Sequence, residues 1–96
     1  MQIYNMERGS GKTTFLIKEA LRTGYPIVCA TEMEKRNKES KIEMLKDEKV
    51  IPIDAKVNIY TVGEIRGLDI KEVLIDDLDY FLRSVINCKV YKATIT

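Results

Sequence analysis

The sequence predicts an α/β fold, in which strands and helices alternate and five strands form a mainly parallel sheet. Three observations lead to this prediction. A glycine-rich loop joins a short apolar run to a helical pattern near the N-terminus. A second apolar run ends in two aspartates, and further β-prone runs alternate with helical segments along the rest of the chain. A parallel sheet with right-handed crossovers accommodates this order.

The first strand and the first helix are predicted at residues 1–6 and 13–23, with Gly24 and Pro26 ending the helix. The turn between them reads Arg8-Gly9-Ser10-Gly11-Lys12-Thr13-Thr14. A strand, a glycine-rich turn, Gly-Lys-Thr and a helix together predict a phosphate-binding loop.

The residue types of this loop suit a nucleoside triphosphate. Glycines let backbone N–H groups approach phosphate oxygens, and the helix N-terminus adds partial positive charge. We expect the Lys12 ammonium to reach the β- and γ-phosphates and act in catalysis, and the Thr13 hydroxyl to coordinate Mg²⁺. The full pattern of such a loop is G-x-x-x-x-G-K-S/T, and Met6 stands at the position of its first glycine. This departure weakens the agreement with the pattern more than it weakens the proposed phosphate binding, because Gly9, Gly11, Lys12 and Thr13 form the part that faces phosphate. The predicted nucleotide-binding residues are Gly9, Ser10, Gly11, Lys12, Thr13 and Thr14.

The middle of the chain predicts two further strands around a charged helix. Residues 26–31 read as a buried second strand, and residues 57–62 alternate as a third. Residues 32–49 carry charges at helical spacing and predict a solvated helix, interrupted near residues 37–40. Residues 63–69 are expected to form a turn or a short helix.

The last third predicts two strands and one helix. Residues 71–77 read as the fourth strand, residues 78–87 as a helix and residues 89–96 as the fifth strand. The helix should direct its apolar side chains inward, namely Leu78, Phe81, Leu82, Val85 and Ile86.

Two carboxylates end the predicted fourth strand, Val73-Leu74-Ile75-Asp76-Asp77. We expect Asp76 to hold the Mg²⁺ shell near the Thr13 hydroxyl, and Asp77 to orient or deprotonate the attacking water. An aspartate pair after a buried strand also serves to cap the following helix, and this alternative stays open.

These two motifs together resemble the P-loop NTPase superfamily, as its Walker A and Walker B motifs. The additional strand between them is similar to the RecA/AAA-like branch. The resemblance implies a three-layer sandwich with strand order 5-1-4-3-2 and nucleotide at the carboxyl edge of the sheet. It also implies a polar residue at the end of the last strand, Thr94 or Thr96. Family members commonly have Glu where this chain has Asp77, which implies slow hydrolysis.

Length and composition indicate a single domain over residues 1–96, in a class that is neither disordered nor membrane-embedded. The net charge of +1 indicates no overall attraction to nucleic acid. Cys29 and Cys88 lie beside apolar residues and suit a reducing cytoplasm. Histidine is absent, so histidine catalysis and histidine metal ligands are excluded.

The leading hypothesis is a magnesium-dependent ATP-binding protein with weak ATPase activity, coupled to nucleic acid or to a larger protein machine and able to form homo-oligomers. Coupling to nucleic acid is favoured only by the helicase-like layout that the resemblance implies, in which the second strand is followed by Thr31, Lys35, Arg36 and Lys38. Arg66 and Arg83 are candidate arginine fingers only if a neighbouring subunit presents them. The compact layout gives the impression of a phage-like protein. The alternative is a nucleotide-binding accessory or inhibitor that does not hydrolyse ATP, and a small-molecule kinase is disfavoured because no lid is visible.

Overall fold

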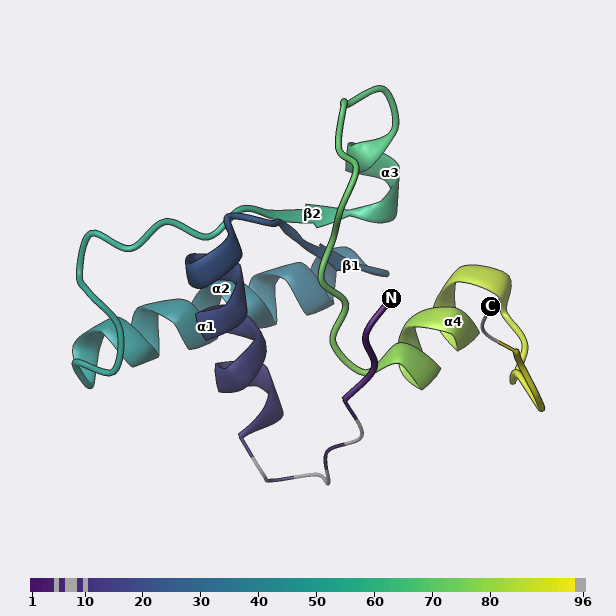
Figure 1. Ribbon diagram of the computed structural model, residues 1–96, viewed down its shortest axis with the longest axis horizontal. Coiled ribbons are helices and arrows are strands. Elements are labelled where there is room, and N and C mark those ends of the chain that lie inside the picture. The colour runs from purple at the N-terminus through teal and green to yellow at the C-terminus, as the bar shows by residue number, and fades with distance from the viewer. Residues whose placement is uncertain (5, 7–8, 10, 95–96) are drawn as a thin grey trace.

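The computed structural model describes residues 1–4, 6, 9 and 11–94, and Figure 1 shows the path of the chain. The element order over this part of the chain is α1 (Lys12–Thr23), β1 (Ile27–Cys29), α2 (Glu32–Asp47), β2 (Ile59–Thr61), α3 (Val62–Ile65) and α4 (Leu78–Ile86). No helix in the described ranges combines the length and the apolar character that crossing a bilayer would take.

The sheet consists of β1 and β2, which run parallel with Ile27 opposite Ile59 and Cys29 opposite Thr61. On its other side β1 forms a single parallel bridge to Leu74. The Val28 N–H donates to the Leu74 carbonyl, and the Leu74 N–H donates to the Pro26 carbonyl, each at 2.9 Å. Strand β1 therefore lies between β2 and the segment around Leu74.

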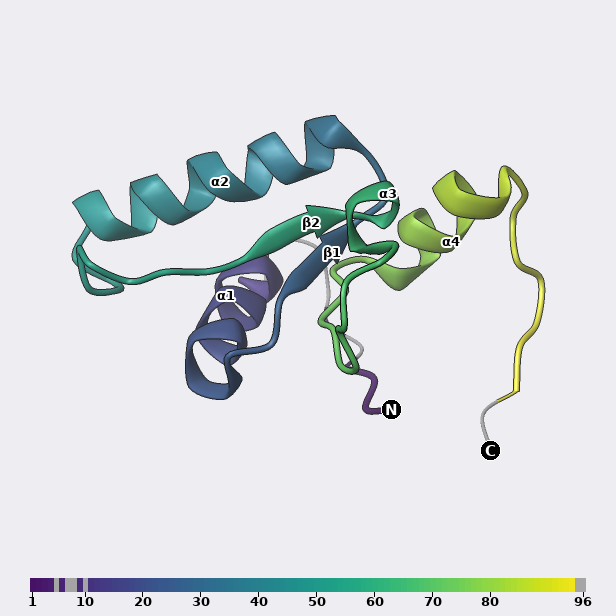
Figure 2. The same cartoon turned by 90° about the horizontal axis from the view of Figure 1, so that it is seen from above.

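Helices α1 and α2 lie on opposite sides of the two strands, as Figure 2 shows. The core forms where these helices meet the strands, and Ile17 of α1 and Ile27 of β1 are fully buried. The burial of apolar side chains from both helices is the main contribution to the stability of this core. The buried cluster comprises Ile17, Ala20, Ile27, Cys29, Ile42, Leu45, Ile51 and Ile59.

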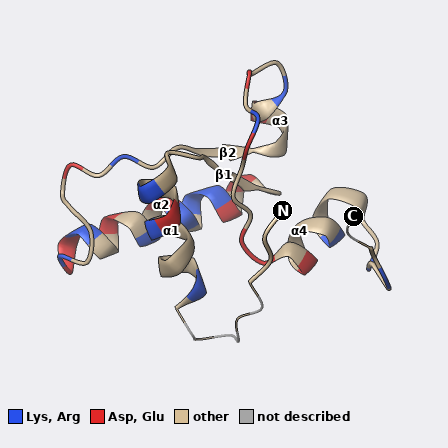
Figure 3. Ribbon diagram, viewed as in Figure 1, with Lys and Arg blue, Asp and Glu red and all other residues tan. Residues whose placement is uncertain are grey.

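Local signals fix the helix ends. Thr31 caps α2, since its hydroxyl accepts from the Glu34 N–H at 3.2 Å. Gly24 ends α1 with φ of 79°, a conformation that glycine adopts without strain, and its N–H donates to the Ala20 carbonyl at 2.9 Å. Acidic and basic residues occur along the whole length of α2, as the red and blue segments of the ribbon in Figure 3 show. Helix α2 runs without the interruption predicted near residues 37–40.

The predicted fold class is wrong. The described residues form a parallel sheet of two strands with four helices, not a three-layer sandwich around five strands. The predicted order 5-1-4-3-2 placed the strand at residues 26–31 at an edge of the sheet, whereas β1 takes the position between β2 and Leu74. The resemblance to the P-loop NTPase superfamily is overturned with it, because the five-stranded sheet which that family requires is not formed.

The predicted terminal strands do not form over the residues described. Residues 1–4 and 6 lie outside regular structure, and Met1 is 88% exposed. The Tyr4 ring packs on the Phe15 ring with centroids 5.0 Å apart, so this segment contacts α1 instead of a strand. Residues 89–94 are irregular, and Tyr91 is 88% exposed. A strand needs a hydrogen-bonding neighbour, and the predicted fourth strand offers only the bridge at Leu74.

Helix α4 forms where predicted, but its apolar face is not buried. None of its residues falls in the buried class, and Val85 and Ile86 are exposed. Leu78, Phe81 and Leu82 are half-buried. The sequence pattern predicted the helix correctly, but the prediction that Val85 and Ile86 point inward is wrong.

Candidate functional site

The glycine-rich loop leads directly into α1, and its two glycines have the backbone conformation that this turn requires. Gly9 has φ of 82° and Gly11 has φ of 83°, a region that other L-residues rarely occupy. A Cβ placed on either glycine would meet no atom of the described residues within 4 Å, so on their side the space beside the loop is open. Ser10, also predicted to bind nucleotide, lies outside the described residues.

The first turn of α1 offers backbone donors. Gly11 is the N-cap, no side chain of the described residues caps this end, and no acidic residue stands in the first turn. The N–H groups of Lys12, Thr13 and Thr14 have no acceptor within the helix, as in the first turn of any α-helix. Together with the helix dipole, these donors suit an anion.

Thr13 and Asp76 are brought together by the fold. The Thr13 hydroxyl donates to Asp76 Oδ2 at 3.0 Å across a separation of 63 residues. Asp76 follows the bridge that holds Leu74 beside β1, and Thr13 lies in the first turn of α1. The bridge beside β1 and the packing of α1 on the core therefore set the position of both side chains.

Lys38 of α2 binds the same carboxylate oxygen. Its Nζ lies 3.1 Å from Asp76 Oδ2 and 3.5 Å from Glu34 Oε2. Burial by itself lowers the pKa of Lys38, but the hydrogen bond to Asp76 and the charges of Asp76 and Glu34 outweigh it and raise the pKa above its usual value. Lys38 is therefore a cation at neutral pH.

Lys38 is part of this site, although the sequence pattern predicted a solvated helix at its position. It is 7% exposed, and it shares its side of α2 with the buried Ile42 and Leu45. Their spacing, four and then three residues, is that of one helix face. That spacing is the sequence signal that identifies Lys38 as inward-facing.

Lys12 and Asp77, the predicted catalytic pair, face one another more loosely. Lys12 Nζ lies 3.9 Å from Asp77 Oδ2, and both side chains remain substantially exposed. Asp77 also caps α4, because its Oδ1 accepts from the Tyr80 N–H at 3.3 Å. Its φ of 52° belongs to the left-handed region, which aspartate tolerates better than most residues. The capping alternative is thus realised in the structure.

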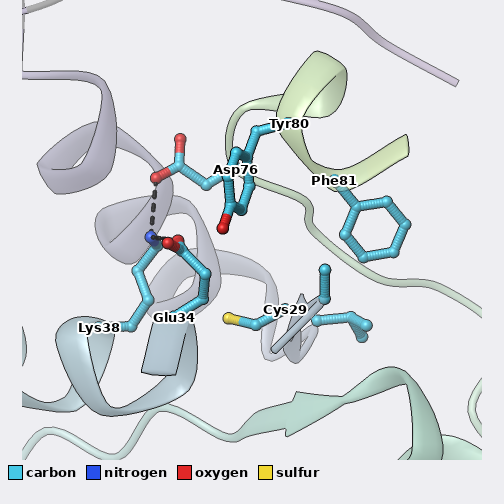
Figure 4. A pocket seen from close by; sticks show the side chains of 8 residues that line it. Cys29, Glu34, Lys38, Asp76, Tyr80 and Phe81 are labelled. Atoms are coloured by element: carbon cyan, nitrogen blue, oxygen red, sulfur yellow. Dashed lines mark ion pairs between the residues drawn. The ribbon is translucent and has the colours of Figure 1, made fainter. Parts of the chain in front are cut away.

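A shallow pocket adjoins Asp76, and Figure 4 shows Lys38 and Asp76 pointing toward one another at its rim. The room inside for water-sized molecules is about 10 Å³, space for no more than about one water molecule. It is too small for a base or a sugar, so the open space beside the loop is the better place for a ligand. The labelled lining residues are Cys29, Glu34, Lys38, Asp76, Tyr80 and Phe81.

The other candidates lie away from these contacts. Arg66 follows α3 and Arg83 stands in the last turn of α4, and both are exposed. Thr94 is exposed and not in a strand, so the predicted polar residue at a strand end is wrong for Thr94, and Thr96 lies outside the described residues. Lys35 binds the Glu64 carboxylate, with its Nζ 2.9 Å from Oε1.

The oxygen atoms at Thr13 and Asp76 fit Mg²⁺, which prefers hydroxyl and carboxylate ligands and retains several waters. No group of three or more Asp, Glu, Cys or His side chains within the described residues could hold a metal by itself. A bound Mg²⁺ would therefore depend on phosphate oxygens as well. Thr13 and Asp76 would supply the protein's share.

The chain matches no family model, no curated protein and no solved structure.

Proposed function

We propose that this chain binds a nucleoside triphosphate, ATP by preference, together with Mg²⁺ at the loop that leads into α1, and hydrolyses it slowly. The observation that carries the proposal is the hydrogen bond from the Thr13 hydroxyl to Asp76 Oδ2. It joins the end of the Gly-Lys-Thr turn to the acidic residue that such a site needs. The sequence between them gives no local reason for the two to meet.

Three features support binding of the phosphate groups. Gly9 and Gly11 keep the loop open on one side, and the first turn of α1 directs N–H donors at it. The Lys12 ammonium is partly exposed, and its ion pair with Asp77 is long at 3.9 Å, so it is available to phosphate oxygens. When bound, Mg²⁺ supplies neutralisation of phosphate charge. The Thr13 hydroxyl and the Asp76 carboxylate would supply the protein oxygens that hold the Mg²⁺ ion.

We expect hydrolysis to be slow because both carboxylate oxygens of Asp77 already have partners. One of its oxygens caps α4 and the other faces Lys12, so neither is directed only at a water molecule. A general base must reach the proton that it removes. Asp77 would have to give up part of its capping role to do so.

The same observation favours a second candidate, a nucleotide-binding accessory or inhibitor protein that does not hydrolyse its ligand. Coupling to nucleic acid loses support from the contacts of the basic residues on α2. Of the three basic residues that suggested nucleic acid, Lys38 is buried against Asp76 and Lys35 is held by Glu64, and Arg36 alone is exposed.

Thermal unfolding with and without ATP and Mg²⁺ tests the proposal, for the wild type, Lys12→Ala and Lys18→Ala. Lys18 lies exposed on α1, two turns from the loop, and serves as the matched control. At a ligand concentration near 100 times Kd, binding adds about 2.7 kcal/mol. For a domain of this size the midpoint should rise by about 10 °C or more.

The wild type and Lys18→Ala should show this rise, and Lys12→Ala should lose most of it. No rise in the wild type at millimolar nucleotide would refute the proposal. Release of phosphate from the wild type, absent in Lys12→Ala, would favour the slow ATPase. Binding without release, with protein partners present, would favour the accessory protein.

A further inference from the structure

Lys38 is the only charged residue in the buried class within the part of the chain that the structure describes. Its side chain projects from the interior of α2, and its ammonium faces the carboxylates of Asp76 and Glu34 (Figure 4). Burying an ammonium is costly unless it is paired. Among the described residues such a buried ammonium occurs at Lys38, whose partner Asp76 belongs to the proposed phosphate site.

The contacts of Asp76 define what Lys38 does there. Asp76 Oδ2 accepts from the Thr13 hydroxyl at 3.0 Å and lies 3.1 Å from Lys38 Nζ. A positive charge thus already stands at the oxygen that faces Thr13. A magnesium ion brought to Thr13 and Asp76 would meet this charge, and two cations sharing one carboxylate repel each other.

Lys38 also stands where it can act on a phosphate group itself. The Thr13 hydroxyl belongs to the turn that would surround the phosphates, and Lys38 binds the same oxygen as that hydroxyl. An ammonium that leaves a carboxylate for a phosphate oxygen keeps a charge-assisted hydrogen bond. The side chain of Lys38 has a flexible four-carbon stem, and a change of rotamer would be needed for its ammonium to leave Asp76.

We propose that Lys38 is a second cation of the phosphate site, which competes with Mg²⁺ for Asp76 and partly replaces it, so that nucleotide binding depends only weakly on Mg²⁺. This inference rests on the proposed function and adds to it the residue that sets the metal requirement. The Lys12 ammonium and the Lys38 ammonium together neutralise the triphosphate when metal is absent. Lys38 would have to leave Asp76 before Mg²⁺ could be held there, so Mg²⁺ would add little to the affinity for nucleotide.

The test compares ATP binding, by calorimetry, in EDTA and in Mg²⁺. The wild type is measured with Lys38→Met, which removes the charge, and with Lys38→Gln, which keeps a hydrogen-bond donor for Asp76. Lys41→Met is the control, because Lys41 lies on α2 and forms none of the ion pairs seen among the described residues. Circular dichroism checks that each variant is folded.

The wild type and Lys41→Met should bind ATP in EDTA within about threefold of their affinity in Mg²⁺. In Lys38→Met and Lys38→Gln the affinity in EDTA should fall by about tenfold, while the affinity in Mg²⁺ holds or rises.

A wild type that binds ATP only with Mg²⁺ overturns this inference and leaves the proposed function standing. Variants at Lys38 that keep the wild-type ratio overturn it as well. A wild type that binds ATP under neither condition refutes the proposed function, and the inference falls with it. A wild-type affinity that depends strongly on Mg²⁺ overturns the inference even where a variant at Lys38 does not fold.

Discussion

The Thr13 hydroxyl and the Asp76 carboxylate meet at 3.0 Å, although 63 residues separate them in the sequence. Thr13 lies in the first turn of α1, on one side of the strands, and Asp76 lies two residues after Leu74, which bridges to β1. Their contact ties the glycine-rich loop to the sheet. It also makes Asp76 a shared acceptor, since Lys38 of α2 binds the same oxygen.

Replacing Asp76 should weaken the fold as well as the site. In Asp76→Asn the Lys38 ammonium stays buried, and of the acidic partners seen among the described residues it keeps only Glu34, whose carboxylate lies 3.5 Å away. A buried charge without its main partner is strongly destabilising, and we expect a loss of about 2–3 kcal/mol in the free energy of unfolding. Urea denaturation at neutral pH measures this loss.

Asp77→Asn is the matched control, one residue along the chain. Asparagine also caps helices and tolerates the left-handed conformation, with φ of 52° here. The Asp77 side chain is largely exposed, and its contact with Lys12 is 3.9 Å long, so the change should cost less than about 1 kcal/mol. Equal losses in the two variants would contradict a special role for Asp76.

The core should be most sensitive at Ile17, which is fully buried between α1 and the strands. Ile17→Ala removes apolar atoms and leaves a cavity, with an expected cost of about 2–4 kcal/mol in the free energy of unfolding. Ile53→Ala is the comparison, because Ile53 is 85% exposed and should change stability by less than about 0.5 kcal/mol. Urea denaturation of both variants checks this, and a mild effect at Ile17 would mean that the core is elsewhere.

The two thiols should react at very different rates. Burial raises the pKa of the Cys29 thiol, and Cys29 lies within the core beside β2, whereas Cys88 is exposed. The thiolate is the reactive form, so we expect Cys29 to react at least about 100-fold more slowly than Cys88 with a disulfide reagent under native conditions. Cys29→Ser and Cys88→Ser assign the two phases. Fast reaction of Cys29 in Cys88→Ser would show that the core opens readily.

The stability that Glu64 contributes should depend on pH. A hydrogen bond from the Thr61 N–H, with help from Lys35, holds the pKa of the Glu64 carboxyl below its usual value of 4.5. Because the folded pKa is the lower one, the contribution is present above pH 4.5 and is lost as the pH falls through the folded pKa.

Thermal midpoints of the wild type and Glu64→Gln, measured from pH 7 down to about pH 3, test this sign. The wild type should be the more stable at pH 7, and the difference should vanish in acid. Glu72→Gln, at an exposed position, should show no such change. A difference at Glu64 that grows as the pH falls would contradict the assignment.

The sequence by itself determined where most of the regular elements lie. The predicted helices at residues 13–23 and 78–87 form within one residue of their predicted bounds, and α2 begins at the predicted Glu32. The strands at residues 26–31 and 57–62 form too, though shorter than expected. Helix periodicity, caps such as Thr31, and glycines with positive φ act over a few neighbouring residues, so they can be read from the chain directly.

The tertiary structure alone decided the size of the sheet, the order of its strands, and which side chains contact Asp76. Strand pairing joins residues far apart in sequence, and alternating residues such as 89–94 form a strand only where a partner edge exists. Lys38 reads locally as one charge among many on α2, and it becomes the buried partner of Asp76 only because α2 packs over β1 and β2. Contacts of this kind depend on how elements pack, a non-local free energy that no short stretch of sequence contains.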